Sequence, residues 1–124
     1  MLLDTNALMV PEQFGVDIFS EMLRLGYSEH LIPSAVQREL EYLAKKAGTG
    51  LDKSAAKVGL GLATRCQIIT LEEDADYALE CLAVRENAAV FTNDKELKKR
   101  LIRKGITVIY LRQGRYLEAA KKEF

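Results

Sequence analysis

Short apolar runs alternate with longer amphipathic stretches along this chain. Runs of aliphatic residues without regular polar alternation predict strands covered on both faces, as in a parallel sheet. They occur at Met1–Asp4, Leu31–Ile32 with flanks, Gln67–Thr70, Ala88–Thr92 and Ile106–Leu111. Between them, apolar residues spaced three and four apart predict helices. We expect these over Asp17–Leu25, Ser34–Ala47, Asp52–Arg65, Leu71–Glu86 and Lys95–Lys104, with a last short helix from Arg115.

Two of these helices are expected to open with a capping box. Ser34 precedes Gln37 by three residues, and Thr70 precedes Glu73 by the same spacing. In this motif the first side chain and the acid or amide three residues later satisfy each other's backbone N–H groups. Glu72 and Glu73 are then first-turn acids that favour the helix dipole, and we assign them no chemistry.

The order of strands and helices predicts the fold class. Alternation of this kind favours right-handed crossovers and a three-layer α/β sandwich, with a central, mostly parallel sheet of four to five strands and helices on both faces. A length of 124 residues suits one domain, spanning residues 1–124. Gly59 and Gly61 weaken the expected third helix, because each costs about 1 kcal/mol relative to alanine. Gly48-Thr49-Gly50 is the expected flexible loop, and it joins two helices.

Composition places the chain in the ordinary globular class, with 48 % hydrophobic and 29 % charged residues. No apolar run is long enough to span a membrane, and the segment Met1–Asp4 lacks the features of a signal peptide, so we expect a cytoplasmic protein without a membrane partner. Charge is uneven: residues 1–90 hold 8 Lys and Arg against 14 Asp and Glu, and residues 91–124 hold 10 against 4. This asymmetry indicates an acidic site flanked by a basic surface, or a solvated helix face.

Cysteine and histidine offer little chemistry. Cys66 and Cys81 are too few and too far apart for a disulfide scaffold or a zinc knuckle, and we expect both to be inert, reduced and buried. His30 is the single histidine, so it cannot build a His-rich metal site, and we interpret it as a strand-edge residue.

Four acids are expected on one rim of the sheet. Asp4 ends the first strand and Asp94 follows the fourth, whereas Glu39 and Asp76 lie early in the helices after the second and third strands. Functional sites of open parallel sheets form beyond the carboxyl ends of the strands. The sequence therefore predicts that these four carboxylates converge.

Each acid also has a structural interpretation. Asp4 and Asp94 could simply cap a turn or helix. Glu39 and Asp76 fall beyond the first turn of their expected helices and border apolar stripes, where an ionised carboxylate is costly without a partner. Converging carboxylates repel one another, and a divalent cation removes that cost. All-oxygen ligands favour Mg²⁺ or Mn²⁺, which serve phosphoryl chemistry.

In this order, the residues resemble the PIN-domain ribonucleases. The matching motifs are Leu3-Asp4-Thr5-Asn6, Glu39 after Pro33-Ser34, Ala75-Asp76, and Thr92-Asn93-Asp94, and together they cover nearly the whole chain. One motif alone is weak, whereas four in order are specific. The segment Phe91–Arg100 looks especially like the branch with the small-subunit rRNA-processing endonuclease and its archaeal single-domain relatives. VapC-type toxins are a second branch.

The resemblance implies an Mg²⁺- or Mn²⁺-dependent endoribonuclease that hydrolyses RNA phosphodiester bonds with metal-activated water. Thr5 and Thr92 would be supporting hydroxyls. One departure is Tyr77, which stands where the family branch commonly has a second acid, and Asp74 could compensate. By motif match, the catalytic and metal-binding acids would be Asp4, Glu39, Asp76 and Asp94.

Partners follow from the same resemblance. The RNA substrate would meet basic residues through its backbone, a sequence-blind and salt-sensitive interaction, although a solvated helix face accounts for about half of them. A homodimer through the apolar surface of Asp17–Leu25, an antitoxin and a ribosome-assembly partner all stay open. The candidate RNA-binding residues are Lys95, Lys98, Lys99, Arg100, Arg103, Lys104, Arg112 and Arg115.

Rival interpretations are weaker. A phosphate-binding P-loop at residues 48–54 fails, because Asp52 stands where glycine must precede Lys53 and because the segment follows a helix. A haloacid-dehalogenase-type phosphatase fails because Asn6 stands at that family's second Asp. The remaining alternative is a non-catalytic PIN-like RNA-binding or ribosome-assembly module with a weak metal site. Retention of all four acids argues against it, and Tyr77 slightly favours it.

Overall fold

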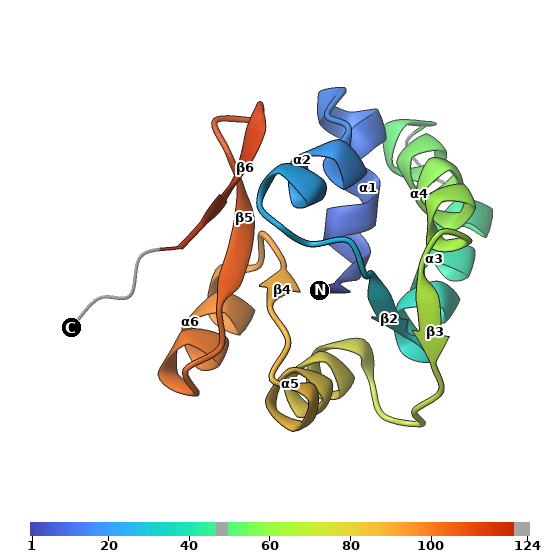
Figure 1. The fold of residues 1–124 in the computed structure, drawn as a ribbon. Helices are drawn as coiled ribbons and strands as arrows, with labels where there is room; N and C mark the ends of the chain where they lie inside the picture. Colours follow the sequence, from blue (N-terminus) through green and yellow to red (C-terminus); the bar gives the residue numbers. More distant parts are fainter. Residues whose placement is uncertain (47–49, 121–124) are drawn as a thin grey trace.

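A six-stranded sheet with the order β3-β2-β1-β4-β5-β6 forms the centre of the computed structural model, which describes residues 1–46 and 50–120 (Figure 1). The first five strands run parallel, and β6 is antiparallel to β5. The described strands are β1 (Leu2–Leu3), β2 (Leu31–Pro33), β3 (Gln67–Ile69), β4 (Val90–Phe91), β5 (Val108–Arg112) and β6 (Tyr116–Ala119). The described helices are α1 (Thr5–Phe14), α2 (Ile18–Arg24), α3 (Ser34–Lys45), α4 (Gly50–Ala63), α5 (Ala75–Glu86) and α6 (Lys95–Arg103).

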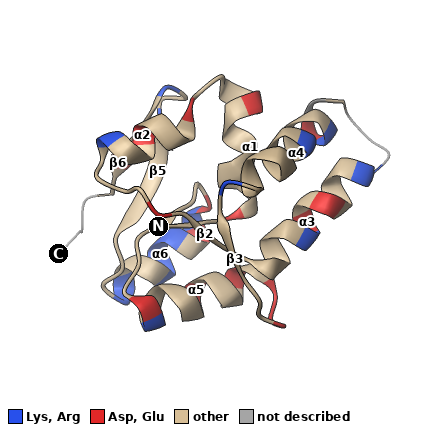
Figure 2. Cartoon of the chain, turned by 45° about the vertical axis from the view of Figure 1, so that its right-hand side comes forward, with Lys and Arg blue, Asp and Glu red and all other residues tan. Residues whose placement is uncertain are grey.

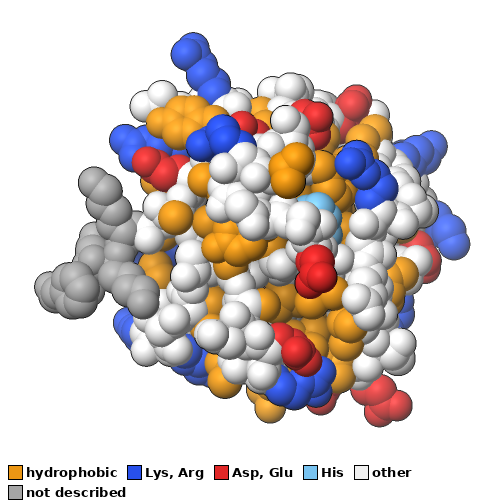
Figure 3. Space-filling model, viewed as in Figure 1, with side chains coloured by type: hydrophobic (Ala, Val, Ile, Leu, Met, Phe, Trp, Pro, Cys, Tyr) orange, Lys and Arg blue, Asp and Glu red, His pale blue; other side chains and the backbone are white. Residues whose placement is uncertain are grey.

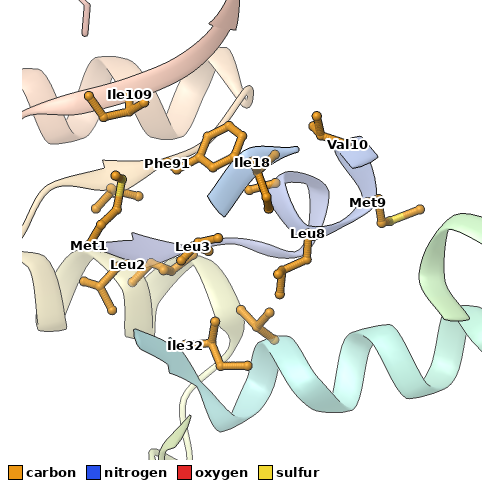
Figure 4. Packing of buried hydrophobic residues seen from close by; sticks show 14 of the residues in the cluster. Met1, Leu2, Leu3, Leu8, Met9, Val10, Ile18, Ile32, Phe91 and Ile109 are labelled. Atoms are coloured by element: carbon orange, nitrogen blue, oxygen red, sulfur yellow. The ribbon is translucent and has the colours of Figure 1, made fainter. Parts of the chain in front are cut away.

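The central strands are buried on both faces. Leu2 and Leu3 of β1 point to opposite faces of the sheet and both are fully buried, as are Val90 and Phe91 of β4. Figure 4 shows Leu2, Leu3 and Phe91 among apolar side chains from neighbouring helices and strands. Burial of each leucine or phenylalanine side chain stabilises the folded state by about 1.5–3 kcal/mol relative to an exposed one. The predicted α/β class with a mostly parallel sheet is confirmed, and the five predicted strands are all present.

Helix α1 was not predicted. Its sequence contains Pro11, which removes a helical N–H donor, and it ends at Gly15 in the left-handed conformation. Asp4 caps its first turn by accepting a hydrogen bond from the N–H of Ala7. The side chains of residues 7–10 are all buried, and this unbroken apolar run obscures the helical periodicity, although Asn6 and Glu12 are exposed.

Gly59 explains how α4 packs against α1. A Cβ at this position would meet the carbonyl oxygen of Leu8 at 3.0 Å and a methyl group of Leu40 at 3.2 Å, whereas a Cβ at Gly61 would meet no atom within 4 Å. The absent side chain at Gly59 lets the two helices approach closely. Of the two glycines that weaken this helix, one therefore has a packing role.

The last predicted element was wrong. Residues from Arg115 were expected to form a helix, but Tyr116–Ala119 is the strand β6. The chain reverses through Gln113 and Gly114, both at positive φ, and this turn places β6 against β5. On the outer edge of β6, the Leu117 N–H donates to Glu21 and the Leu117 carbonyl accepts from Arg24. Glu21 and Arg24 form an ion pair with each other on α2.

Both expected capping boxes were also wrong. Pro33 occupies the cap position of α3, and the Ser34 hydroxyl instead exchanges hydrogen bonds with the backbone N–H and carbonyl of Leu71. Helix α5 begins at Ala75 and is capped by Asp74, so Glu72 and Glu73 precede it. Residues 47–49 of the expected loop, and Ala47 of the expected α3 stripe, lie outside the described residues.

The two cysteines differ in their surroundings. Cys66 is half-buried, and burial raises the pKa of its thiol to about 11; Cys81 is exposed, which contradicts its expected burial. His30 directly precedes β2, and its ring meets Phe19 edge-on with centroids 4.9 Å apart. None of the described helices combines the length and apolar character needed to cross a membrane.

Candidate active site

The carboxyl ends of β1 to β4 meet at one rim of the sheet, because these strands are mutually parallel. At this rim is a pocket of about 380 Å³. All four predicted metal-site acids line it, although they come from four separate segments of the chain. Its lining consists of Asp4, Thr5, Asn6, Glu39, Asp74, Ala75, Asp76 and Asp94.

Asp4 lies deepest among the acids. It is 6 % exposed, and its Oδ1 accepts a hydrogen bond from the Ala7 N–H at 2.7 Å. Burial raises the pKa of Asp4 to about 6, against hydrogen bonds from Thr92 and Ala7 that lower it, and the charges of Asp76 and Asp94 raise it further. A carboxylate held in this way would gain free energy from a bound cation.

Thr92 connects two of the acids. Its buried hydroxyl donates to Oδ2 of Asp4 and accepts from the N–H of Asp94 at 3.0 Å. Asp94 caps α6, with its Oδ1 accepting from the N–H groups of Glu96 and Leu97 at 2.9 and 3.2 Å. The capping role expected as the structural interpretation of Asp94 is therefore present, and the same residue lines the pocket.

Asp76 lies in the first turn of α5, because that helix begins later than the sequence predicts. The argument that Asp76 falls beyond the first turn was therefore wrong. Its side chain is 57 % exposed, and its Oδ2 lies 3.9 Å from Nη2 of Arg100. Burial, followed by the charge of Asp94, raises the pKa of Asp76, and Arg100 opposes this shift. Asp74 caps α5 by accepting from the N–H of Tyr77.

Glu39 and Thr5 line the pocket in contrasting environments. Glu39 lies in the second turn of α3, as the sequence predicts, and reaches the pocket from the side of β2. It is exposed, so the expected cost of an unpartnered carboxylate beside the core does not apply to it. Thr5 is 4 % exposed, and among the described residues its hydroxyl has no hydrogen-bond partner. The sequence did not single out Asn6 or Ala75 as lining residues; Asn6 could have been found as the exposed neighbour of the motif's first acid.

These residues fit a hard divalent cation chemically. The donor set contains carboxylate and hydroxyl oxygens without His or Cys, and Thr5 supplies a buried polar oxygen in need of a partner. Within residues 1–46 and 50–120, no three His, Cys, Asp or Glu side chains gather closely enough to enclose an ion. The roles of individual acids stay predictions.

Comparison with known proteins places this geometry in a family. Residues 1–114 match the family model described as "PIN like domain". The chain belongs to the PIN-like domain family.

Two curated relatives of this PIN-like domain are named ribonucleases. Ribonuclease VapC9 of Archaeoglobus fulgidus is 33 % identical over 114 residues, covering 92 % of this chain and 84 % of the relative. Ribonuclease VapC4 of Methanocaldococcus jannaschii is 35 % identical over 122 residues, covering 93 % and 92 %. The expected PIN-domain ribonuclease resemblance is confirmed, and these relatives carry the name of the VapC branch.

A solved structure supports the fold alone. It is a domain of a functionally unknown protein from Methanocaldococcus jannaschii, with a TM-score of 0.62 and 20 % identity. The alignment covers 99 % of this chain and 94 % of that chain. The topology is therefore shared over the full length of the PIN-like domain.

Basic residues of the PIN-like domain are frequent on α6, whose cap residue Asp94 lines the acidic pocket (Figure 2). Three of the predicted RNA-binding residues already have partners: Arg100 binds Glu80 and Asp76, Arg112 binds Glu118 at 2.7 Å, and Lys98 lies over the Tyr110 ring. The other five candidates are all exposed to solvent, and they are Lys95, Lys99, Arg103, Lys104 and Arg115.

A second pocket of about 450 Å³ lies at the opposite, amino rim of the sheet. Arg65 stacks over the Phe19 ring there at 3.8 Å, and Nε2 of His30 is buried without a hydrogen-bond partner among the described residues. Figure 3 shows the single histidine beside hydrophobic side chains on this face. Asp17 is the one acid in its lining, so this pocket does not resemble the acidic site.

Proposed function

We propose that this PIN-like domain is an endoribonuclease that hydrolyses RNA phosphodiester bonds with the help of Mg²⁺ or Mn²⁺. The observation that supports it best is the gathering of four carboxylates, distant in sequence, around one pocket at the carboxyl rim. Asp4, Glu39, Asp76 and Asp94 would hold the cation. When bound, it would polarise a phosphate oxygen and lower the pKa of water.

The chain's own residues would prepare this site in different ways. Asp4 is buried and hydrogen-bonded on both oxygens, so it is the fixed ligand around which the others adjust. Thr92 orients Asp4 and the backbone of Asp94 together. Thr5 has a buried hydroxyl without a partner in the described part of the chain, and this hydroxyl would donate to a phosphate oxygen. Asp74 uses Oδ1 to cap α5, and its other carboxylate oxygen would compensate for Tyr77, which stands where the family branch commonly has a second acid.

Relatives named VapC favour a toxin-like ribonuclease over a role in rRNA processing. An antitoxin would then be the protein partner. A ribosome-assembly partner and a homodimer through α2, where Leu23 is 64 % exposed, stay predictions.

Cleavage of a single-stranded RNA labelled with a fluorophore and quencher tests the activity. The wild-type protein should cleave it with Mn²⁺ and not with EDTA, and Asp4→Asn should lower the rate by about 100-fold or more. Asparagine keeps an acceptor for the Ala7 N–H, so the fold should persist. Asp17→Asn is the matched control, because Asp17 likewise caps a helix but lies away from the pocket.

Equal cleavage by wild type and Asp4→Asn would indicate a contaminant and contradict the proposal. RNA binding without cleavage by the wild type would instead support the non-catalytic module. In that case wild type and Asp4→Asn would both bind RNA, and the two proteins would differ only in how their RNA binding depends on metal.

RNA binding by α6 can be tested in the Asp4→Asn background, where substrate would persist. Replacing Lys95, Lys99 and Arg103 with alanine should weaken RNA binding and lower the slope of log affinity against log salt by about 0.7 for each phosphate that is no longer neutralised. Lys57, exposed on α4, provides a control replacement. An unchanged slope would exclude α6 as the RNA-binding surface.

A further inference from the structure

Arg100 joins α6 to α5 beside the acidic pocket. Its Nε lies 2.9 Å from Oε1 of Glu80, and its Nη2 lies 3.9 Å from Oδ2 of Asp76. Glu80 follows Asp76 by four residues, so the two acids share one face of α5. Because Asp76 lines the pocket, the guanidinium links a non-pocket acid to a pocket acid.

The two contacts of Arg100 differ in kind. Glu80 has a side chain that is 13 % exposed, and its short contact is a charge-assisted hydrogen bond that fixes the guanidinium. Asp76 is 57 % exposed and lies at the limit of an ion pair, where water screens the attraction. Asp76 can therefore move away from Arg100 without breaking the contact between α5 and α6.

We propose that Arg100 is a built-in counter-cation of the acidic pocket, which offsets carboxylate repulsion without metal and competes with a divalent cation for Asp76. This inference rests on the proposed function, since it requires Asp76 to meet a metal ion. A guanidinium keeps its charge at any physiological pH, so the competition is permanent. Arg100 is a positioning residue that acts through Asp76, and it sets the metal concentration at which the site fills.

Titration with Mn²⁺ alone, followed by the electron paramagnetic resonance signal of free Mn²⁺, tests this role without RNA. Arg100→Met should bind Mn²⁺ about three- to tenfold more tightly than wild type, because one repelling charge is removed in a water-screened site. Its metal-free form should melt at a lower temperature. Arg100→Lys, which keeps the charge, should restore wild-type affinity. Arg103→Met, exposed on the same helix, should leave affinity within about twofold.

Unchanged Mn²⁺ affinity in Arg100→Met would reduce Arg100 to a structural bridge and overturn the inference. Weaker binding would overturn it as well, because Arg100 would then orient Asp76 for the metal rather than compete with it. If circular dichroism shows that Arg100→Met is unfolded, Arg100→Gln takes its place with the same expectation, since its amide can still bond to Glu80.

Failure of the proposed function is distinguishable. A wild-type protein that binds Mn²⁺ no better than Asp4→Asn overturns both the metal-dependent function and the counter-cation. The counter-cation fails alone when Asp4→Asn weakens Mn²⁺ binding as expected but Arg100→Met matches wild type.

Discussion

The Thr92 hydroxyl donates a hydrogen bond to Oδ2 of Asp4, joining the ends of β4 and β1 across 88 positions of the sequence. These two strands are neighbours in the sheet, so the contact follows from their parallel pairing. The same hydroxyl accepts from the Asp94 N–H, and one small side chain therefore sets the relative position of two pocket acids.

Replacing Thr92 with valine should remove the hydrogen bonds that its hydroxyl makes with Asp4 and with the Asp94 N–H. Thr92 lowers the pKa of Asp4, so its loss should raise that pKa above about 6, and the pH at half-maximal Mn²⁺ binding should rise with it. The loss of a buried hydrogen bond should also cost about 1–2 kcal/mol of unfolding free energy. Thr92→Ser keeps the hydroxyl and should retain the wild-type pH dependence of Mn²⁺ binding and the wild-type free energy of unfolding. Thr70→Val, at an exposed position, is the control. A valine variant with unchanged pH dependence would exclude the support role.

Asp4 should make the metal-free protein less stable as pH rises. Its pKa is about 6 in the fold, against 3.8 for an ordinary Asp, and burial is the main cause. Between these values the folded state binds more protons than the unfolded state. The free energy of unfolding therefore falls as pH rises through this window, by at most about 3 kcal/mol.

Asp4→Asn lacks this proton, so its stability should change less than that of wild type between pH 4 and 7. Urea unfolding of both proteins in EDTA measures the difference, with Asp17→Asn as the control. Parallel pH profiles for wild type and Asp4→Asn would show that Asp4 titrates normally.

Asp94 caps α6 and lines the pocket, and substitution can separate the cap from the role in cleavage that we propose. Asp94→Asn keeps a side-chain oxygen for the Glu96 and Leu97 N–H groups, so stability should stay close to wild type while RNA cleavage falls. Asp94→Ala loses the cap as well and should cost about 1 kcal/mol. Chemical denaturation and the RNA assay together provide both readouts. Full cleavage by Asp94→Asn would leave Asp94 with a capping role alone.

Gly59 and Gly61 offer a matched pair for the packing of α4. Gly61→Ala should stabilise the protein by about 0.5–1 kcal/mol, because alanine favours a helix and the added methyl group meets open space. Gly59→Ala should destabilise it, since the methyl group would meet the backbone carbonyl of Leu8 at 3.0 Å. Thermal unfolding measures both. Equal stabilisation by the two variants would contradict the close approach of α1 and α4.

The strands could be predicted because their apolar runs reflect burial on both faces. Helix α1 could not, because Pro11 and burial of residues 7–10 hide its periodicity. Strand β6 depends on its partner β5 and on a turn with positive φ, so its four residues carry too little local pattern to distinguish strand from helix. The missed strand therefore depends on its tertiary partner, whereas the missed helix also contains a proline that local propensity disfavours.

The four acids could be found because strand ends, not helix depth, determine where they lie. Asp76 was placed too deep in its helix, yet it reaches the pocket because β3 delivers it to the correct rim. The Arg100–Glu80 contact was missed, since it joins α6 to α5 across 20 positions and only their packing brings the two side chains together. The sequence therefore indicated which acids line one pocket and named Thr92 as a supporting hydroxyl, but it did not indicate the contact between the two helices.

The Glu21–Arg24 pair on α2 makes the two borders of the sheet unequal. By occupying the backbone N–H and carbonyl of Leu117, it obstructs the addition of another strand at the middle of β6. At the other border, β3 is the terminal strand, with Ile68 39 % exposed. A second copy could pair its own β3 with this β3. The resulting continuous sheet would then have an obstructed β6 at both of its ends. Growth would stop at a pair and could not proceed to a filament.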